Sequence, residues 1–97
     1  MAEKISREAE AQIPAFKDAR EAIAWFKEKY ASDFILQDTE PIGGELCHFY
    51  ALVHDWEAYM KGRKQLQMQG GHAVGLEFLL SYQPIQIMAD GSVHIVH

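Results

Sequence analysis

The stretch DFILQDTEPIGGELCHFYALVHD, residues 33–55, decides the fold because it holds two strand-like runs separated by turn residues. The runs 33–39 and 45–54 are rich in aromatic and branched side chains, which favour β-strands. Between them stand Pro41 and two consecutive glycines, a composition typical of a loop that reverses the chain. The segment therefore predicts an antiparallel β-hairpin.

The C-terminal residues 84–97, PIQIMADGSVHIVH, predict a second hairpin. We expect Asp90 and Gly91 to form a two-residue type I′ turn, in which both central residues have positive φ. Such a turn fixes the register of the two strands. His94 would then lie opposite Ile87, on a mainly apolar face of the hairpin.

Helical patterns flank these hairpins. Residues 18–30 begin with Asp18 and Glu21 in capping-box spacing and predict the first long helix. Residues 56–69 predict a second helix, and residues 73–82 a short helix that Pro84 would end. Both of these later segments also fit strands by their alternation, so the choice between helix and strand stays open.

The order of these elements predicts an α+β fold with an N-terminal helix, a β-hairpin, one or two short helices and a C-terminal β-hairpin. We expect one antiparallel sheet with helices packed on one face, and a single domain over residues 17–97. Residues 1–16 carry only a thin apolar stripe that Pro14 would end, so we expect this N-terminal segment to be frayed.

Both faces of the predicted strands are apolar, which is unusual for an antiparallel sheet in a small protein. Residues 46–54 place Phe49 and Val53 on one face, and Tyr50 and Leu52 on the other. A second copy of the chain, a different protein partner or the short helices alone could cover the second face. A homodimer is the expectation, because symmetric self-association is the commonest solution.

Charge is distributed unevenly along this 97-residue chain, whose formal net charge is −5. Residues 31–60 contain six acidic side chains and no Lys or Arg, and the only basic cluster is Lys61, Arg63 and Lys64. Nucleic-acid binders usually present a broad basic surface, so nucleic acid is not the expected partner, and a weak interaction with it through this cluster is the second alternative. The cluster also suits an acidic protein, or the acidic hairpin of a second copy.

The setting expected from the sequence is cytoplasmic. There is one cysteine, so no internal disulfide can form, and no apolar run is long enough to cross a membrane. No cofactor-binding motif is present, because the paired glycines lack the Lys and Ser or Thr of a phosphate-binding loop. We therefore expect no cofactor and no membrane contact.

Cys47, His48 and His54 are close in sequence, but a strand separates them in space. Alternate residues point to opposite faces, and six residues span about 20 Å, so the three cannot share a metal ion. The remaining alternative is a small enzyme or metal-binding protein that uses His48 and His94 across two strands. Ordinary hydrogen-bonded histidines, and a Cys47 packed as an apolar group, are the expected outcome.

Aromatic and basic residues are therefore the candidates for binding, since aromatic side chains are frequent at binding hot spots. No nucleophile and base pair, cofactor loop or metal spacing is found, which favours a non-catalytic binding or regulatory module acting through protein–protein contacts as a homodimer. The partner-binding candidates are Trp25, Trp56, Tyr59, Lys61, Arg63 and Lys64.

Overall fold

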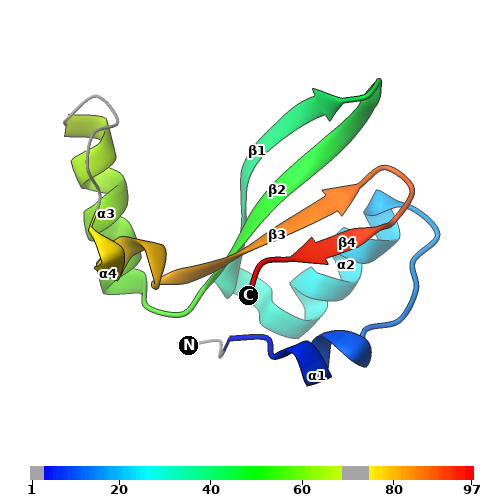
Figure 1. The fold of residues 1–97 in the computed structure, drawn as a ribbon, viewed down its shortest axis with the longest axis horizontal. Helices are drawn as coiled ribbons and strands as arrows, with labels where there is room; N and C mark the ends of the chain where they lie inside the picture. Colours follow the sequence, from blue (N-terminus) through cyan, green and yellow to red (C-terminus); the bar gives the residue numbers. More distant parts are fainter. Residues whose placement is uncertain (1–3, 69–74) are drawn as a thin grey trace.

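A computed structural model describes residues 4–68 and 75–97 of the chain. Within them, one sheet of four antiparallel strands is accompanied by four α-helices and one 3₁₀ turn (Figure 1). The elements in chain order are α1 (Arg7–Ala11), α2 (Ala19–Tyr30), η1 (Ala31–Asp33), β1 (Phe34–Ile42), β2 (Glu45–Val53), α3 (Trp56–Met68), α4 (Leu76–Leu79), β3 (Tyr82–Met88) and β4 (Val93–Ile95).

The strands lie in the order β1-β2-β3-β4, and each neighbouring pair is antiparallel. The predicted α+β class, with helices packed against an antiparallel sheet, is confirmed. β1 and β4 are the two edges of the sheet (Figure 1). The sheet therefore has one long edge strand and one short one, since β1 has nine residues and β4 has three.

The first hairpin is tighter than predicted. Ile42 pairs with Glu45, so only Gly43 and Gly44 form the turn, with φ of 60° and 84°. Positive φ at both central positions is the requirement of a type I′ turn, which glycine meets without steric cost. β1 consequently runs through Pro41, which the sequence had placed in the loop.

The second hairpin corrects the predicted register. The Met88 amide donates to the Ser92 carbonyl at 2.9 Å, and the Gly91 amide donates to the Met88 carbonyl at 3.0 Å. The loop therefore has three residues, 89–91, of which only Gly91 has positive φ, at 89°. This is a turn followed by a left-handed residue, a common three-residue hairpin loop.

One additional loop residue exchanges the two faces of β4. Gln86 pairs with His94 and Ile87 pairs with Val93, so the predicted pairing of Ile87 with His94 is wrong. The Asp90 carboxylate accepts from the Ser92 amide at 2.9 Å, which stabilises the longer loop. Hydrogen bonding to the Ser92 side chain, and then to its amide, lowers the pKa of the Asp90 carboxyl group. His94 is exposed as a result, and Ile95 enters the core.

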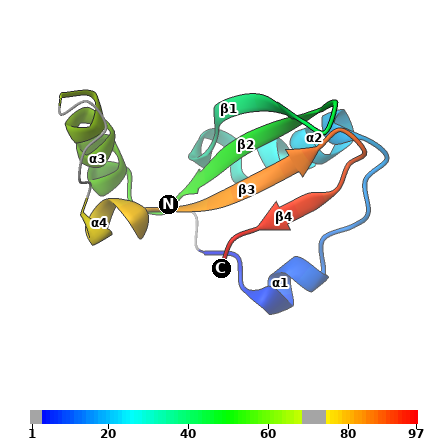
Figure 2. The same cartoon turned by 45° about the horizontal axis from the view of Figure 1, so that its top comes forward.

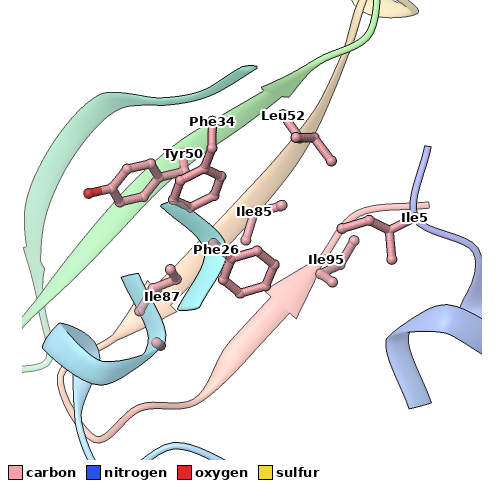
Figure 3. Packing of buried hydrophobic residues seen from close by; sticks show 9 residues of the cluster. Ile5, Phe26, Phe34, Tyr50, Leu52, Ile85, Ile87 and Ile95 are labelled. Atoms are coloured by element: carbon pink, nitrogen blue, oxygen red, sulfur yellow. The ribbon is translucent and has the colours of Figure 1, made fainter. Parts of the chain in front are cut away.

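The main core lies between the sheet and α2, on what we call the α2 face. Asp18 caps α2 as predicted, because its carboxylate accepts from the Glu21 amide at 2.9 Å. Phe26 is fully buried, and Figure 3 shows its ring among isoleucines of β3 and β4. The buried residues of this cluster are Ile5, Ala22, Phe26, Phe34, Tyr50, Leu52, Ile85, Ile87 and Ile95.

Hydrogen bonds from the Gln83 side chain join the N-terminal segment to this core. The buried Gln83 amide donates to the Ile5 carbonyl at 3.0 Å, and its oxygen accepts from the Ile5 amide at 2.8 Å. Further along, His97 Nε2 lies 2.7 Å from Glu10 Oε1. Ile5 is therefore part of the core, whereas α1 contributes no buried residue. Fraying of residues 1–16 stays a prediction.

The opposite side of the sheet, the α3 face, is covered at one end only. Figure 2 shows α3 and α4 beyond the point where β2 ends and β3 begins, away from the turn of the first hairpin. Ala51 and Val53 pack there with Tyr59 of α3 and Phe78 of α4, and the two rings lie 5.6 Å apart. A Cβ at Gly62 would overlap the Phe78 ring, so this glycine lets α3 and α4 pack closely.

The segment after α3 differs from its prediction. A helix was expected over residues 73–82, but α4 spans only Leu76–Leu79 and β3 begins at Tyr82; residues 73 and 74 lie outside the described residues. Pro84 lies inside β3. Its carbonyl accepts from the Val96 amide at 3.0 Å, so its backbone polar groups face away from β2. A residue in an antiparallel strand directs its N and C=O to the same side, so the missing N–H leaves the ladder with β2 intact.

Candidate binding groove between β1 and α3

Five of the six predicted binding residues line one groove, between the edge strand β1 and helix α3. The groove has a volume of about 810 Å³, and β1 contributes residues 35–37 to it. Trp25 is the only predicted residue that lies elsewhere. The residues contributed by α3 are Trp56, Tyr59, Met60, Lys61, Arg63, Lys64 and Gln67.

The β1 wall of the groove contains an irregularity in the strand. The register shifts between Leu36 and Asp38, so Gln37 is an extra residue opposite β2. A bulge bends its strand and re-aims the local side chains. Gln37 donates from Nε2 to Tyr59 Oη at 3.2 Å, and Leu36 keeps 54% of its surface exposed.

The α3 wall begins at Asp55, which caps the helix by accepting from the Ala58 amide at 3.1 Å. Trp56 donates from Nε1 to Asp33 Oδ1 at 2.6 Å, and this bond ties the first turn of α3 to the start of β1. Tyr59 is buried and contacts Trp56 edge to face, with ring centroids 5.7 Å apart. Hydrogen bonds at both aromatic residues thus fix the distance between the two walls.

Three cations form one rim of the groove. Lys61, Arg63 and Lys64 are exposed and follow one another along α3. Within residues 4–68 and 75–97 the one ion pair closer than 4.0 Å joins His97 to Glu10, so no described carboxylate neutralises this rim. Beside the cations, Met60 is 58% exposed. The groove therefore combines apolar surface with unneutralised positive charge.

Trp25 lies on α2, far from this groove in the fold. Its ring contacts Phe16 and Phe26 at centroid distances of 5.8 and 4.9 Å. Lys29 Nζ lies 4.9 Å from the centroid of the Trp25 ring on the solvent side, within range of a cation–π contact. Trp25 is half-buried at the margin of the core, which agrees with its place on the flank of the helix.

The structure does not bring the two candidate histidines together. His48 pairs with Ile87 on the α2 face and lies 3.2 Å from Thr39 Oγ1 through Nδ1. His94 pairs with Gln86 on the α3 face. The proposed cross-strand pair depended on the predicted register of β4, and the three-residue turn removes that basis. Nowhere in the described ranges do three His, Cys, Asp or Glu side chains gather closely enough to hold a metal ion.

Cys47 is fully buried on the α3 face, opposite Met88. Burial raises the pKa of its thiol, and the negative charge of Glu40 raises it further. The nucleophilic form of cysteine is the thiolate, so both effects make this residue less reactive.

A smaller hollow of about 290 Å³ lies between residues 10–16 and the β3–β4 turn. Its rim carries the carboxylates of Glu10 and Asp90, and none of the predicted binding residues lines it. We favour the larger groove because it joins exposed apolar side chains with three cations, the combination that distinguishes a binding surface from an ordinary surface hollow.

Sequence reasoning missed the β1 half of the groove. Leu36 and Gln37 belong to a strand whose edge position depends on the strand order, which a single hairpin does not define. The only local signal was the polar pair Gln37 and Asp38 after three apolar residues, which interrupts the alternation of the strand.

Comparison with known proteins finds no relative of this chain. No protein-family model, no curated protein and no solved structure matches the chain. Among the helices of the described residues, none has the length and apolar character needed to cross a membrane. The function must therefore be argued from the groove itself.

Proposed function

We propose that this protein is a non-catalytic binding module that takes an extended, acidic segment of a protein into the groove between β1 and α3. The observation that carries the proposal is the groove, where an open strand edge, exposed apolar side chains and three cations meet. A reducing, cytoplasmic setting, in which the thiol of Cys47 stays unoxidised, is part of the same proposal.

The strand edge supports an extended ligand. β1 is an outer strand, so half of its backbone N–H and C=O groups face away from β2 and can pair with an added strand. The pairing is limited in length, because the bulge at Gln37 interrupts the edge and Pro41 has no N–H to donate. An added segment would therefore use the backbone of residues 34–36 and obtain its remaining affinity from side chains.

The side chains of the groove define the chemistry of the ligand. Successive side chains of a segment paired with β1 point to opposite faces of the sheet. Carboxylates on the α3 face can therefore reach the cationic rim, while the neighbouring side chains lie beside the exposed Leu36 on the α2 face. Exposed cations direct an acidic ligand to its site and exclude a basic one. We therefore expect apolar and acidic residues to alternate in the ligand.

A direct test uses three blocked octapeptides that alternate Val with Glu, Lys or Ser, each labelled with fluorescein. The Glu peptide should bind the protein, the Ser peptide more weakly and the Lys peptide not at all, as followed by fluorescence anisotropy. Binding of the Glu peptide should weaken as salt is added, since exposed charges are screened.

The matched variants separate this site from general charge effects. Lys61→Glu/Arg63→Glu/Lys64→Glu should reverse the preference, so that the Lys peptide binds instead. Lys17→Glu/Arg20→Glu/Lys27→Glu makes the same change in net charge at exposed positions outside the groove, and should leave the preference as it is. Equal binding of all three peptides would contradict the proposal, and preferential binding of a labelled oligonucleotide through the same cations would replace it with the nucleic-acid alternative.

A further inference from the structure

We propose that the acidic segment is the β1–β2 hairpin of a second copy of this chain, so that the protein forms a two-fold symmetric dimer through its β1 edges. The inference rests on the proposed function, since it assigns an occupant to the same groove. It also gives the expected homodimer a defined interface. Charge, face and symmetry each support this occupant.

The hairpin carries negative charge, which is complementary to the positive charge of the groove. Asp38, Glu40 and Glu45 are exposed on it, and no Lys or Arg lies between residues 30 and 61. None of the three takes part in an ion pair within the described parts of the chain. One molecule therefore presents an unneutralised acidic surface and an unneutralised basic surface, at different ends of the same strand pair.

The acidic side chains of the hairpin project from the α3 face of the sheet. Asp38 pairs with Phe49 and Glu40 pairs with Cys47, which places both carboxylates on the side of Ala51, the side that α3 covers. A two-fold axis perpendicular to the sheet joins two β1 strands antiparallel and keeps the same face of both sheets on one side. The carboxylates of one copy would thus project on the same side as α3 of the other.

The axis also aligns the acidic hairpin of one copy with the basic rim of the other along the direction of the paired strands. In Figure 1 the turn of the hairpin points away from α3. Antiparallel pairing therefore directs this turn toward the α3 of the second copy. An axis beside the bulge, between Gln37 and Asp38, would place Glu40 opposite the partner's Ile35, at the wall of the groove. Pro41, which cannot donate, would then lie opposite the partner's Phe34, close to the end of the shared ladder.

Exposed apolar side chains on the hairpin fit the same interface. Leu36, Ile42 and Leu46 keep 54%, 48% and 52% of their surfaces exposed, although they belong to the two longest strands. Each would be brought toward the other copy by pairing at β1. Because the contact is isologous, it occupies both β1 edges and closes as a dimer instead of extending into a fibre.

The test is a charge exchange measured by sedimentation equilibrium. The wild-type protein should have twice the mass of its 11.1 kDa chain. Glu40→Lys/Glu45→Lys makes the hairpin basic, Lys61→Glu/Lys64→Glu makes the groove acidic, and each variant alone should dissociate at least about tenfold more readily because like charges meet. An equimolar mixture should restore the dimer, since each hairpin then meets an oppositely charged groove. Restoration on mixing would also show that both variants are folded.

The failure of this inference can be separated from that of the proposed function. The variant Glu40→Lys/Glu45→Lys keeps its groove, so it should bind the Val-Glu octapeptide. A monomeric wild-type protein, or two variants that stay dimeric on their own, would overturn the dimer; if the octapeptide still binds this variant, the module then takes a different acidic protein. If the octapeptide does not bind it, the proposed function itself fails. The control Lys17→Glu/Lys27→Glu should leave the dimer intact.

Discussion

The two faces of the sheet are covered in different ways. On the α2 face, Phe26 stacks on Phe34 at a centroid distance of 5.2 Å and Phe34 stacks on Tyr50 at 4.2 Å, so aromatic rings connect the helix to β1 and β2 without interruption. On the α3 face the helices cover one end of the strands and leave a groove of about 810 Å³ beside β1. The α2 face is closed, and the α3 face is partly open.

This difference shows how a small domain can combine stability with a binding surface. The larger buried cluster and the N-terminal segment both lie on the α2 face. The α3 face has a second, smaller buried cluster of four residues. Exposed apolar side chains can remain at the groove because the α2 face supplies most of the burial that stabilises the fold. Three substitutions test this assignment.

The largest effect is expected at the centre of the α2 face. Phe26→Ala should lower the free energy of unfolding by about 3–5 kcal/mol, because a fully buried ring leaves a cavity. Urea denaturation followed by circular dichroism measures the change. Trp25→Ala, at the half-buried margin of the same helix, is the control and should cost clearly less. Equal losses would mean that the core does not centre on Phe26.

An intermediate effect is expected where α3 meets α4. Gly62→Ala should destabilise the protein by about 1–3 kcal/mol, because the added methyl group would overlap the Phe78 ring. Helix propensity alone predicts the opposite sign, a gain of about 1 kcal/mol. Thermal unfolding of this variant beside Glu57→Ala, an exposed position of the same helix, decides between them. A more stable Gly62→Ala protein would show that α4 does not pack on α3.

The smallest effect is expected where the N-terminal segment joins the core. Gln83→Leu removes both hydrogen bonds to the Ile5 backbone and should cost about 1 kcal/mol, because water can replace them once the segment detaches. Hydrogen exchange of the Ile5 amide should become much faster while that of Phe26 stays slow. Gln86→Leu, on the opposite face of the same strand, should leave the Ile5 amide protected. Fast exchange at Ile5 in the unmodified protein would support the predicted fraying instead.

The sequence was informative where a local pattern determines a local structure. Asp18 and Asp55 each precede an apolar periodic run, and each caps the expected helix through its carboxylate. The two hairpins were also recognisable, because glycine at a turn between β-forming runs has few alternatives. Strand order and the groove depend instead on which segments meet in three dimensions. Lys61 and Leu36 line one groove although no local pattern connects them.

The predicted register of β4 differs from the observed one by a single residue. The pair Asp90 and Gly91 suits both a two-residue turn and the last two positions of a three-residue loop, and the two differ by one in the pairing of β4. Burial separates them, because the observed register places Ile95 beside Ile85 in the core and His94 in solvent. The sequence alternates apolar and polar residues over only three positions of β4, too short a run to identify the buried face.

The three-residue loop 89–91 also has an evolutionary consequence. Loss of Ser92, with this loop kept, would place Val93 opposite Met88 and move every side chain of β4 to the other face at once. His94 would then lie opposite Ile87, the residue that His48 also pairs with from the neighbouring strand. A single codon deletion would thus place two imidazoles on one face of the sheet, flanking one isoleucine. Ser92, the first residue after the loop, keeps them apart, and a descendant without it would acquire the elements of a new site without any substitution.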